Sequence, residues 1–461
     1  MKDKKSGFKA KYEDTLFDNS FVHRIDIRIA EADWTDLLEN PINKTRYNAD
    51  ITIDGETLKN TVLSTKGLSS LVFPFLKPGN QRYSLKINFG KNVKNQTYQG
   101  LDKLDLSCCF RDTTLMKDYF SYRLFRKADV PAPLTSYAWI TVNGKAHGLY
   151  LIVEKTEESF LERNFGKGVI YKPYTSDLEK TPEEMIAEAK DLVENGLPED
   201  DSEDEVHGAD FAYIDDDPAS YPDILEHRKT DGGRKDDEAV IASLKVLLQG
   251  RKMKKGLNTH EIIRYFAVHN FLLNYDSYTG TALHNMVICE KEGILNVMPW
   301  DYNLAFGTYV SGIGKEVLED PTNLLNLGID TPLIDAEEKD RPLWSWIMQK
   351  EKYRQEYHDV LSDLVETYFE SGLFEKEFEA RMAMIAPYAE KDPNAFYSYE
   401  EFKKGCDVLR RFCLKRAESV RKQLNGELAT DTTKQNDRDK VSASDLNVMD
   451  MGAYVFLPKE K

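Results

Sequence analysis

Hydrophobic and polar residues alternate in short runs between residues 21 and 174, a period-two pattern that is typical of strands with one buried face. The run RYSLKINF (residues 82–89) shows the pattern most clearly, because large apolar side chains alternate with polar ones along it. Asp-Gly at 54–55 and Asn-Gly at 143–144 have the sequence of two-residue hairpin turns. The pattern therefore predicts a small sheet built from hairpins.

A helical period interrupts this sheet at residues 112–133, DTTLMKDYFSYRLFRKADVPAP. It predicts a helix of about four turns that opens at the polar Asp112-Thr113 pair and is stopped by two prolines. The next hairpin, AWITVNGKAHGLYLIVEK, runs into a short helix, EESFLERNF. Residues 15–174 are thus expected to form a β-rich unit with one long helix packed on its sheet.

The composition changes after residue 174. Residues 175–236 include the acidic, turn-rich stretch EDDSEDEVHGADFAYIDDDP, which is typical of a solvated insertion, with a specific binding loop as the alternative. Residues 237–426 show mainly helical periods. Residues 427–461 form a polar C-terminal tail that is expected to be mobile.

Within the helical part, NTHEIIRYFAVHNFLL predicts a helix in which Asn258 and Glu261 have the spacing of a capping box. The stretch NMVICEKEGILNVMPW predicts a hairpin that turns near Glu292-Gly293. Further helices are expected at about 342–367 and 399–425.

The charge and composition of the chain limit the classes of partner that it is expected to bind. The chain has 62 basic and 79 acidic side chains and a net charge of −17, which repels nucleic acid and anionic membranes and would attract a Lys/Arg-rich protein substrate. There is neither a long apolar run nor the apolar core of a leader, so we expect no membrane segment and a cytoplasmic protein, or an exported or cell-surface one if a leader has been removed. The five cysteines lack metal-site spacing and are expected to be buried free thiols.

Three oxygen-bearing side chains raise the possibility of a metal site. Asp276 lies in the loop after the capped helix, Asn285 begins the first strand of the next hairpin, and Asp301 follows its second strand. Because a hairpin returns to its start, Asn285 and Asp301 are expected within a few ångströms of each other. Such oxygens suit Mg²⁺, or Mn²⁺ in its place, bound together with phosphate. The alternative is that they only cap loops and turns.

The order aspartate, asparagine, hairpin, aspartate repeats the order of catalytic and metal-binding residues in protein kinases. A kinase also needs a lysine for the phosphates and a helix acid that positions this lysine. Lys86, on the polar face of its strand, and Asp118, on the following helix, have the right order, although each alone is more typical of a solvated surface charge.

Weaker candidates surround this set. The stretch STKGLSS, with Gly67 and Ser69, could wrap phosphates with backbone N–H groups, but many turns look the same. Glu154 ends a strand where a hinge would present backbone groups to adenine, or is an ordinary strand-end charge. No GxSxG, HExxH or P-loop pattern is present, and His147, His269 and His284 lack ligand spacing.

At these residues the sequence resembles the CotH kinase family of atypical protein kinases. The resemblance rests on ordered motifs over more than 300 residues: ADWTDLLEN, YSLKINF, TLMKDYFSYRLF with VPAP, NGKAHGLYLIVEK, FLERNFG with IYKP, HNFLLNYDSYTGTALHN, MPWDYNLAFG and RRFCLKRAESVRKQL. It implies an α+β, divergent protein-kinase-like fold with a β-rich N-terminal lobe, a mainly helical C-terminal lobe and a cleft between them. It also implies Mg²⁺-dependent transfer of phosphate from ATP to Ser or Thr of protein substrates, such as spore-coat proteins.

Carried over by motif, the resemblance makes Asp276 the catalytic aspartate, Asn285 and Asp301 the metal ligands, and Lys86 with Asp118 the nucleotide-positioning pair. This sequence departs from the family pattern in two places. Many relatives have WDxD where this chain has WDYN, so Asn303 would offer a neutral oxygen to the metal in place of a carboxylate. LDLSCCF replaces an Asn-rich strand, which puts two cysteines, 108 and 109, where polar side chains would line the cleft.

Three functions remain open at this point. The first is an active protein kinase acting on Ser or Thr. The second is a surface adhesin or scaffold with a degenerate site, although such a protein has no physical need for clustered carboxylates. The third is a kinase-like enzyme that transfers AMP in place of phosphate.

Overall fold

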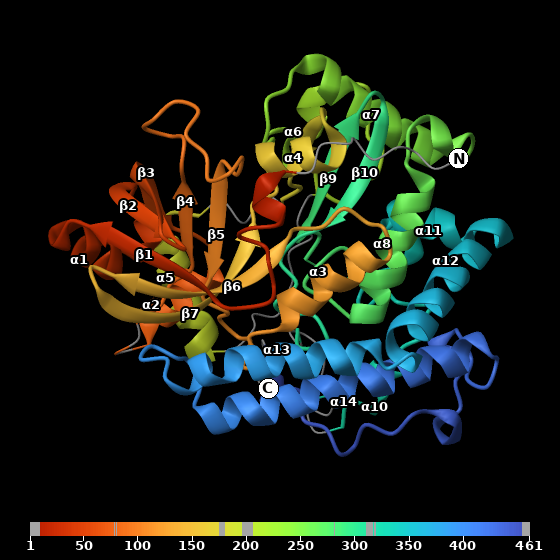
Figure 1. Cartoon of the computed structure of the whole chain (residues 1–461). Coiled ribbons are helices and arrows are strands. Elements are labelled where there is room, and N and C mark those ends of the chain that lie inside the picture. The colour runs from red at the N-terminus through yellow and green to blue at the C-terminus, as the bar shows by residue number, and fades with distance from the viewer. Residues whose placement is uncertain are drawn as a thin grey trace.

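The computed structural model describes residues 10–453 except 78, 80, 175–179, 196–205, 281, 310–316, 318 and 319. Its N-terminal part is a closed barrel of seven strands in the order β1-β2-β3-β4-β5-β7-β6, on the left of Figure 1. The strands are β1 (His23–Ile29), β2 (Tyr47–Ile53), β3 (Glu56–Thr65), β4 (Leu85–Asn88), β5 (Lys103–Ser107), β6 (Thr135–Val142) and β7 (Lys145–Glu154).

The alternating sequence explains the barrel. In β1 the side chains of Ile25, Ile27 and Ile29 are buried and those between them are more exposed, so one face points into the barrel core. The expected turns at 54–55 and 143–144 are confirmed, with both residues of each at positive φ. Strands β1 and β6 pair in parallel and close the barrel, which the expectation of a small sheet had missed.

Three helices are inserted between the barrel strands along the chain: α1 (Glu31–Glu39), α2 (Ser69–Leu76) and α3 (Lys117–Lys127). Helix α3 contacts β6 on one side and α8 on the other, and Figure 1 shows it between the barrel and the helical part. It is shorter than expected because Asp112 forms a turn ahead of it: its carboxylate accepts hydrogen bonds from the backbone N–H groups of Thr114 and Lys117, at 3.0 and 2.9 Å.

The rest of the chain is mainly helical around a second, antiparallel sheet of order β10-β9-β8. Its strands are β8 (Val169–Tyr171), β9 (Met286–Lys291) and β10 (Ile294–Pro299), and the expected turn at 292–293 joins the last two. The helices are α4 (Glu158–Phe165), α5 (Pro182–Asn195), α6 (Pro222–Leu225), α7 (Arg234–Gln249), α8 (Thr259–Leu272), α10 (Thr322–Leu325), α11 (Pro342–Met348), α12 (Glu351–Leu364), α13 (Leu373–Glu390) and α14 (Tyr399–Leu424). Figure 1 shows α13 and α14 running along one side of both parts.

The structure differs from two local expectations about the helices. The start of α8 lacks the expected capping box: the Asn258 amide donates to the Glu261 carboxylate, and the Asn258 side chain accepts no hydrogen bond from a backbone N–H of the first turn. The helix expected at 342–367 is divided into α11 and α12, and the latter continues into a π-helical turn, Val365–Glu370. None of the helices in the described ranges is long and apolar enough to span a bilayer.

The acidic insertion is more integrated than expected. Helix α5 packs on α2, and Ala189 lies in a small apolar cluster with Leu71 and Val72. Phe211, from the acidic stretch itself, and Tyr221, just after it, are fully buried in the main core. The described part of residues 175–236 is therefore largely packed structure, because its aromatic residues supply core contacts that the surrounding acidic residues hide in the sequence.

The polar C-terminal tail is also packed, at least to residue 453. Leu446, Val448 and Met451 are almost fully buried, and the last two lie in a 3-10 turn, Val448–Met451, against α14. The buried ammonium of Lys117 donates to the carbonyl of Gly452 at 2.7 Å. The expected mobile tail is thus corrected for residues 428–453, because sparse apolar residues anchor it.

Candidate active site

The β9–β10 hairpin brings Asn285 and Asp301 to the same end of the sheet. Met286 pairs with Pro299, and the backbone N–H of Trp300 donates to the Asn285 carbonyl at 3.3 Å, so the two residues flank the mouth of the hairpin as predicted. Both have positive φ, 56° for Asn285 and 55° for Asp301. Such conformations are uncommon for residues other than glycine and are often found at functional sites.

Asp276 is held in place from two sides. One carboxylate oxygen lies 3.0 Å from the His284 Nε2, and the other accepts a hydrogen bond of 2.8 Å from Asn285. Burial disfavours a charge on His284, but Asp276 and the carbonyl of Ala282 outweigh burial and raise the pKa of the imidazole. The carboxylate is thereby fixed beside Asn285, and His284 helps to orient it.

Helix α3 fixes the chain just beyond the hairpin. Asp118 and Tyr122 are one turn apart, and they accept the backbone N–H groups of Tyr302 and Asp301, at 2.7 and 2.9 Å. Burial, and next the charge of Asp301, raise the pKa of Asp118 to about 8. Asp118 and Asp301 are therefore two carboxylates of one site, and Asp118 belongs with the metal-binding candidates.

Three lysines surround Trp300, the residue before Asp301. The ammonium groups of Lys155, Lys66 and Lys172 lie 5.0, 5.2 and 5.4 Å from the centre of its ring. These are cation–π distances, and the indole is almost fully buried, with 7% of its surface exposed. The charges of Asp301 and Asp118 also act on Lys66, so positive and negative groups meet at Trp300.

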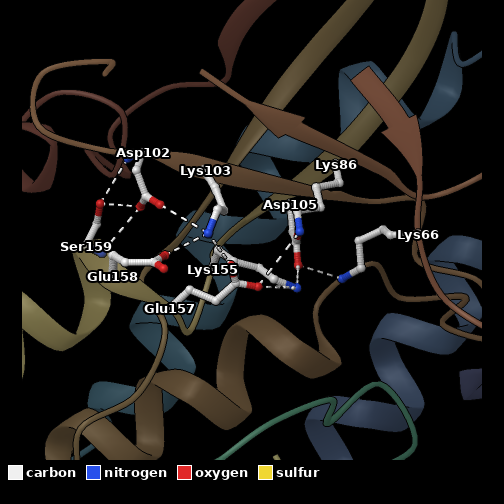
Figure 2. Close-up of polar contacts among 9 residues, drawn as sticks. All are labelled: Lys66, Lys86, Asp102, Lys103, Asp105, Lys155, Glu157, Glu158 and Ser159. Atoms are coloured by element: carbon white, nitrogen blue, oxygen red, sulfur yellow. Dashed lines mark hydrogen bonds and ion pairs between the residues drawn. The ribbon is translucent and has the colours of Figure 1, made fainter. Parts of the chain in front are cut away.

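Asp105, on β5, binds two of these lysines. Its Oδ2 lies 2.8 Å from the Lys66 Nζ and 3.3 Å from the Lys155 Nζ, and its side chain is fully buried (Figure 2). Burial alone would raise its pKa, but the charges of Lys155 and Lys66 lower it to about 2. The pair of a buried acid and Lys66 has the chemistry that was predicted for Asp118 and Lys86.

Lys86 does not pair with Asp118. Its Nζ lies 3.8 Å from Glu157, and Figure 2 shows that Glu157 also pairs with Lys155, which links Lys86 to the network of Asp105 and Lys66. Asp118 binds the Tyr302 backbone. The order of residues in the sequence was right for a lysine–acid pair, but the barrel brings a different lysine, Lys66, to the hairpin.

The weaker candidates for nucleotide binding, Gly67, Ser69 and Glu154, do not all lie next to the lysines at Trp300. Gly67 and Ser69 directly follow Lys66, and Gly67 has a φ of 109°. Glu154 is fully buried, binds Arg163 at 2.6 Å, and its backbone N–H donates to the Leu134 carbonyl. It therefore has a structural role, and that N–H is unavailable for adenine.

Asn303 and the cysteines also take structural positions. The Asn303 amide donates to the Phe110 carbonyl at 3.3 Å, and its contacts in the described part of the chain do not include Asn285 or Asp301. All five cysteines are free and buried, as expected. Cys108 hydrogen-bonds with Ser84 inside the barrel, so it packs rather than lining an open surface.

The oxygen set fits a divalent cation only in part. Asn285 donates both amide hydrogens to Asp276, which leaves its Oδ1 as an acceptor, and Asp118 leaves one carboxylate oxygen without a described hydrogen bond. No group of three His, Cys, Asp or Glu side chains among the described residues forms a complete metal site. An incomplete set of this kind fits Mg²⁺, which commonly takes one or two carboxylates together with phosphate oxygens and water.

Sequence reasoning missed Lys66, Lys155, Lys172 and Trp300. Each is the first residue after a strand: β3, β7, β8 and β10, respectively. A lysine directly after an apolar run, as in LIVEK and IYK, was the available signal. It was too common to select these residues without knowing that the four strand ends converge.

Comparison with known proteins agrees with the motifs. The profile of the family described as CotH kinase protein matches residues 64–420, which include every residue of this site. The inner spore coat protein H of Bacillus subtilis (strain 168) is 21% identical over 422 residues, or 88% of this chain and 96% of that protein. The chain belongs to the CotH kinase protein family.

Proposed function

We propose that the chain is an atypical protein kinase that transfers the γ-phosphoryl group of ATP to Ser or Thr hydroxyls of a protein substrate, with Mg²⁺. The barrel and the helical part would then serve as the two lobes of a kinase-like fold. The observation that carries the proposal is the meeting at Trp300 of three lysines with the carboxylates of Asp301 and Asp118. Cations for phosphate and acids for a metal are the two halves of a phosphoryl-transfer site.

The residues divide into roles by chemistry. Lys66, held by the buried Asp105, would bind phosphate oxygens, in place of the pair of Lys86 and Asp118 that the sequence favoured. Asp301, Asn285 and Asp118 would hold Mg²⁺, whose charge would stabilise the phosphates. Gly67 and Ser69 would border the phosphates from the loop after β3.

In the transfer step, the acceptor hydroxyl oxygen forms a bond to the γ-phosphorus. The bond from this phosphorus to the oxygen that bridges to the β-phosphate breaks, and ADP leaves. Asp276 accepts the hydroxyl proton, because His284 and Asn285 hold its carboxylate in one orientation.

The proposal also includes a class of protein substrate. The net charge of −17 favours Lys/Arg-rich proteins by long-range attraction. The name of the Bacillus subtilis relative places that protein in a spore coat, so we propose coat proteins as the substrates to try first, and association with a spore coat as the location to examine.

The test is incorporation of label from γ-labelled ATP with Mg²⁺ into a Lys/Arg-rich protein that contains Ser and Thr. Asp301→Ala should lower the rate about 100-fold or more, the range for loss of one group that stabilises transition-state charge. It should melt within a few degrees of the unmodified chain, because Asp301 is exposed. Asp363→Ala, an exposed acid on α12, is the matched control and should leave the rate unchanged.

Labelling that persists in Asp301→Ala would remove Asp301 from the mechanism. The mass of the modified substrate decides the kind of transfer, since an added nucleotide in place of a phosphoryl group would make the enzyme an AMP transferase. If Mg²⁺ and ATP neither label a protein nor raise the melting temperature, an adhesion or scaffold role replaces the kinase proposal.

A further inference from the structure

Lys172 differs from the other two lysines at Trp300. It follows β8, in the second sheet, whereas Lys66 and Lys155 follow barrel strands. Its ammonium lies 5.4 Å from the centre of the Trp300 ring, and its side chain is half-buried. The ammonium group makes no hydrogen bond or ion pair with any described residue, whereas those of Lys66 and Lys155 share Asp105.

The charges around Lys172 are unbalanced. Three ammonium groups face one indole, and the described carboxylates in ion pairs with them, Asp105 and Glu157, pair with Lys66 or Lys155 and not with Lys172. Burial lowers the pKa of Lys172 to about 7, and the charges of Lys155 and Lys66 also lower it, against the opposing pull of Asp301. Even a half-buried cation without a counterion loses part of its hydration, and a bound anion would offset this cost.

We propose that Lys172 binds a phosphate oxygen of the nucleotide tail, from the side of the second sheet and opposite Lys66. This inference rests on the proposed function and adds a ligand to it. The phosphates would then be held from both sides of Trp300, by Lys66 and Lys155 from the barrel and by Lys172 from β8. Asp301, whose charge acts on both Lys66 and Lys172, would place the metal beside the same phosphates.

A packing role for Lys172 is the competing explanation, since its methylene chain also lies at the indole. Lys172→Met separates the two, because methionine keeps an unbranched apolar stem and loses the charge. Lys172→Arg keeps the charge on a longer side chain. The matched control is Lys167→Met, which removes one charge from the same part of the fold, at a side chain that is 73% exposed and paired with Glu292.

The experiment measures binding to the purified full chain by calorimetry, with Mg²⁺·ATP and with adenosine, which has no phosphate, as probes. Lys172→Met should weaken Mg²⁺·ATP binding about tenfold or more, a change of about 1.4 kcal/mol, and leave adenosine binding unchanged. Lys172→Arg should retain most of the ATP affinity. Lys167→Met should bind both probes as the unmodified chain does.

The outcomes separate this inference from the function on which it rests. If the unmodified chain binds Mg²⁺·ATP and Lys172→Met binds it equally well, Lys172 is no phosphate ligand and the kinase proposal stands. If Lys172→Met weakens ATP and adenosine to the same extent, the lysine acts through packing, and the inference is wrong. If the unmodified chain does not bind Mg²⁺·ATP, both proposals fail.

Discussion

Asp118 shows how burial beside a second carboxylate changes the protonation of a single residue. It is buried beside Asp301, and its one described hydrogen bond comes from the Tyr302 backbone. With its pKa raised to about 8, it takes up a proton on folding across the pH range in which the unfolded chain has already released it. A divalent cation next to both carboxylates would reverse this preference, because it favours their charged forms.

This predicts a pH dependence of stability. Without divalent metal, the free energy of unfolding should fall as the pH rises from about 4 to about 8, by up to about 1.4 kcal/mol per pH unit, because the folded form binds the extra proton. Asp118→Asn keeps an acceptor for the Tyr302 N–H and cannot ionise, so its stability should fall less over this range. Melting temperatures between pH 5 and 8.5, with and without Mg²⁺, measure the effect. Equal pH slopes for the two proteins would contradict it.

At the scale of elements, the site is built where strands end. The residues directly after β3, β7 and β8 surround the indole of Trp300, which directly follows β10, and two side chains of α3, one turn apart, hold the chain after Trp300. Strand ends suit this purpose because the strands fix their positions while the next residue is free to turn. The loop after β3 contains Gly67, whose φ is positive.

Substitution of Gly67 tests whether that loop positions Lys66. Its φ of 109° is rare for other residues, and an added Cβ would lie 2.1 Å from the Ser70 Oγ. Gly67→Ala should destabilise the protein by about 1–3 kcal/mol and weaken Mg²⁺·ATP binding, because the adjacent Lys66 would shift away from Asp105. Gly55→Ala, at a φ of 92° with open space around it, should cost some stability without affecting ATP binding. Unchanged ATP affinity in Gly67→Ala would show that the loop does not position Lys66.

The sequence predicted those parts of the site that depend on local structure. Asn285 and Asp301 meet because one hairpin joins them, and the Glu-Gly turn that defines this hairpin is visible in the sequence. The position of Lys66 at Trp300 could not be predicted, since Lys66 follows β3 and Lys86 lies on β4, the strand paired with β3, and only the closed barrel decides which lysine faces the hairpin. The buried aromatic residues of the acidic insertion were missed because net charge masked a few apolar positions.

At the scale of the whole molecule, the C-terminal segment supports the site from a distance. Lys117, the first residue of α3, donates hydrogen bonds to the carbonyls of Gly452 and Arg111 and to the Thr308 hydroxyl. Asp118 is the next residue. The last described turn of the chain therefore contacts the helix that carries one of the proposed metal ligands.

Substitutions at two adjacent positions test whether the C-terminal segment stabilises the fold. Val448 is fully buried and Met449 is 42% exposed. Val448→Asp should lower the free energy of unfolding by about 3–5 kcal/mol, since it buries an unpaired charge, whereas Met449→Asp should stay within about 0.5 kcal/mol. Urea unfolding monitored by circular dichroism measures both. Similar midpoints for the two variants would mean that residues 446–452 contribute little to the fold.

The closure of the barrel between β1 and β6 also has a consequence for biosynthesis. The residues joined across this seam, such as Asp26 and Thr141, are 115 positions apart, so the first strand leaves the ribosome long before its parallel partner exists. Until then one edge of β1 has no neighbour, and a strand edge in that condition can pair with another chain. We expect slow refolding and losses to aggregation at high protein concentration, with synthesis past residue 142 as the point at which the nascent chain becomes resistant to proteolysis.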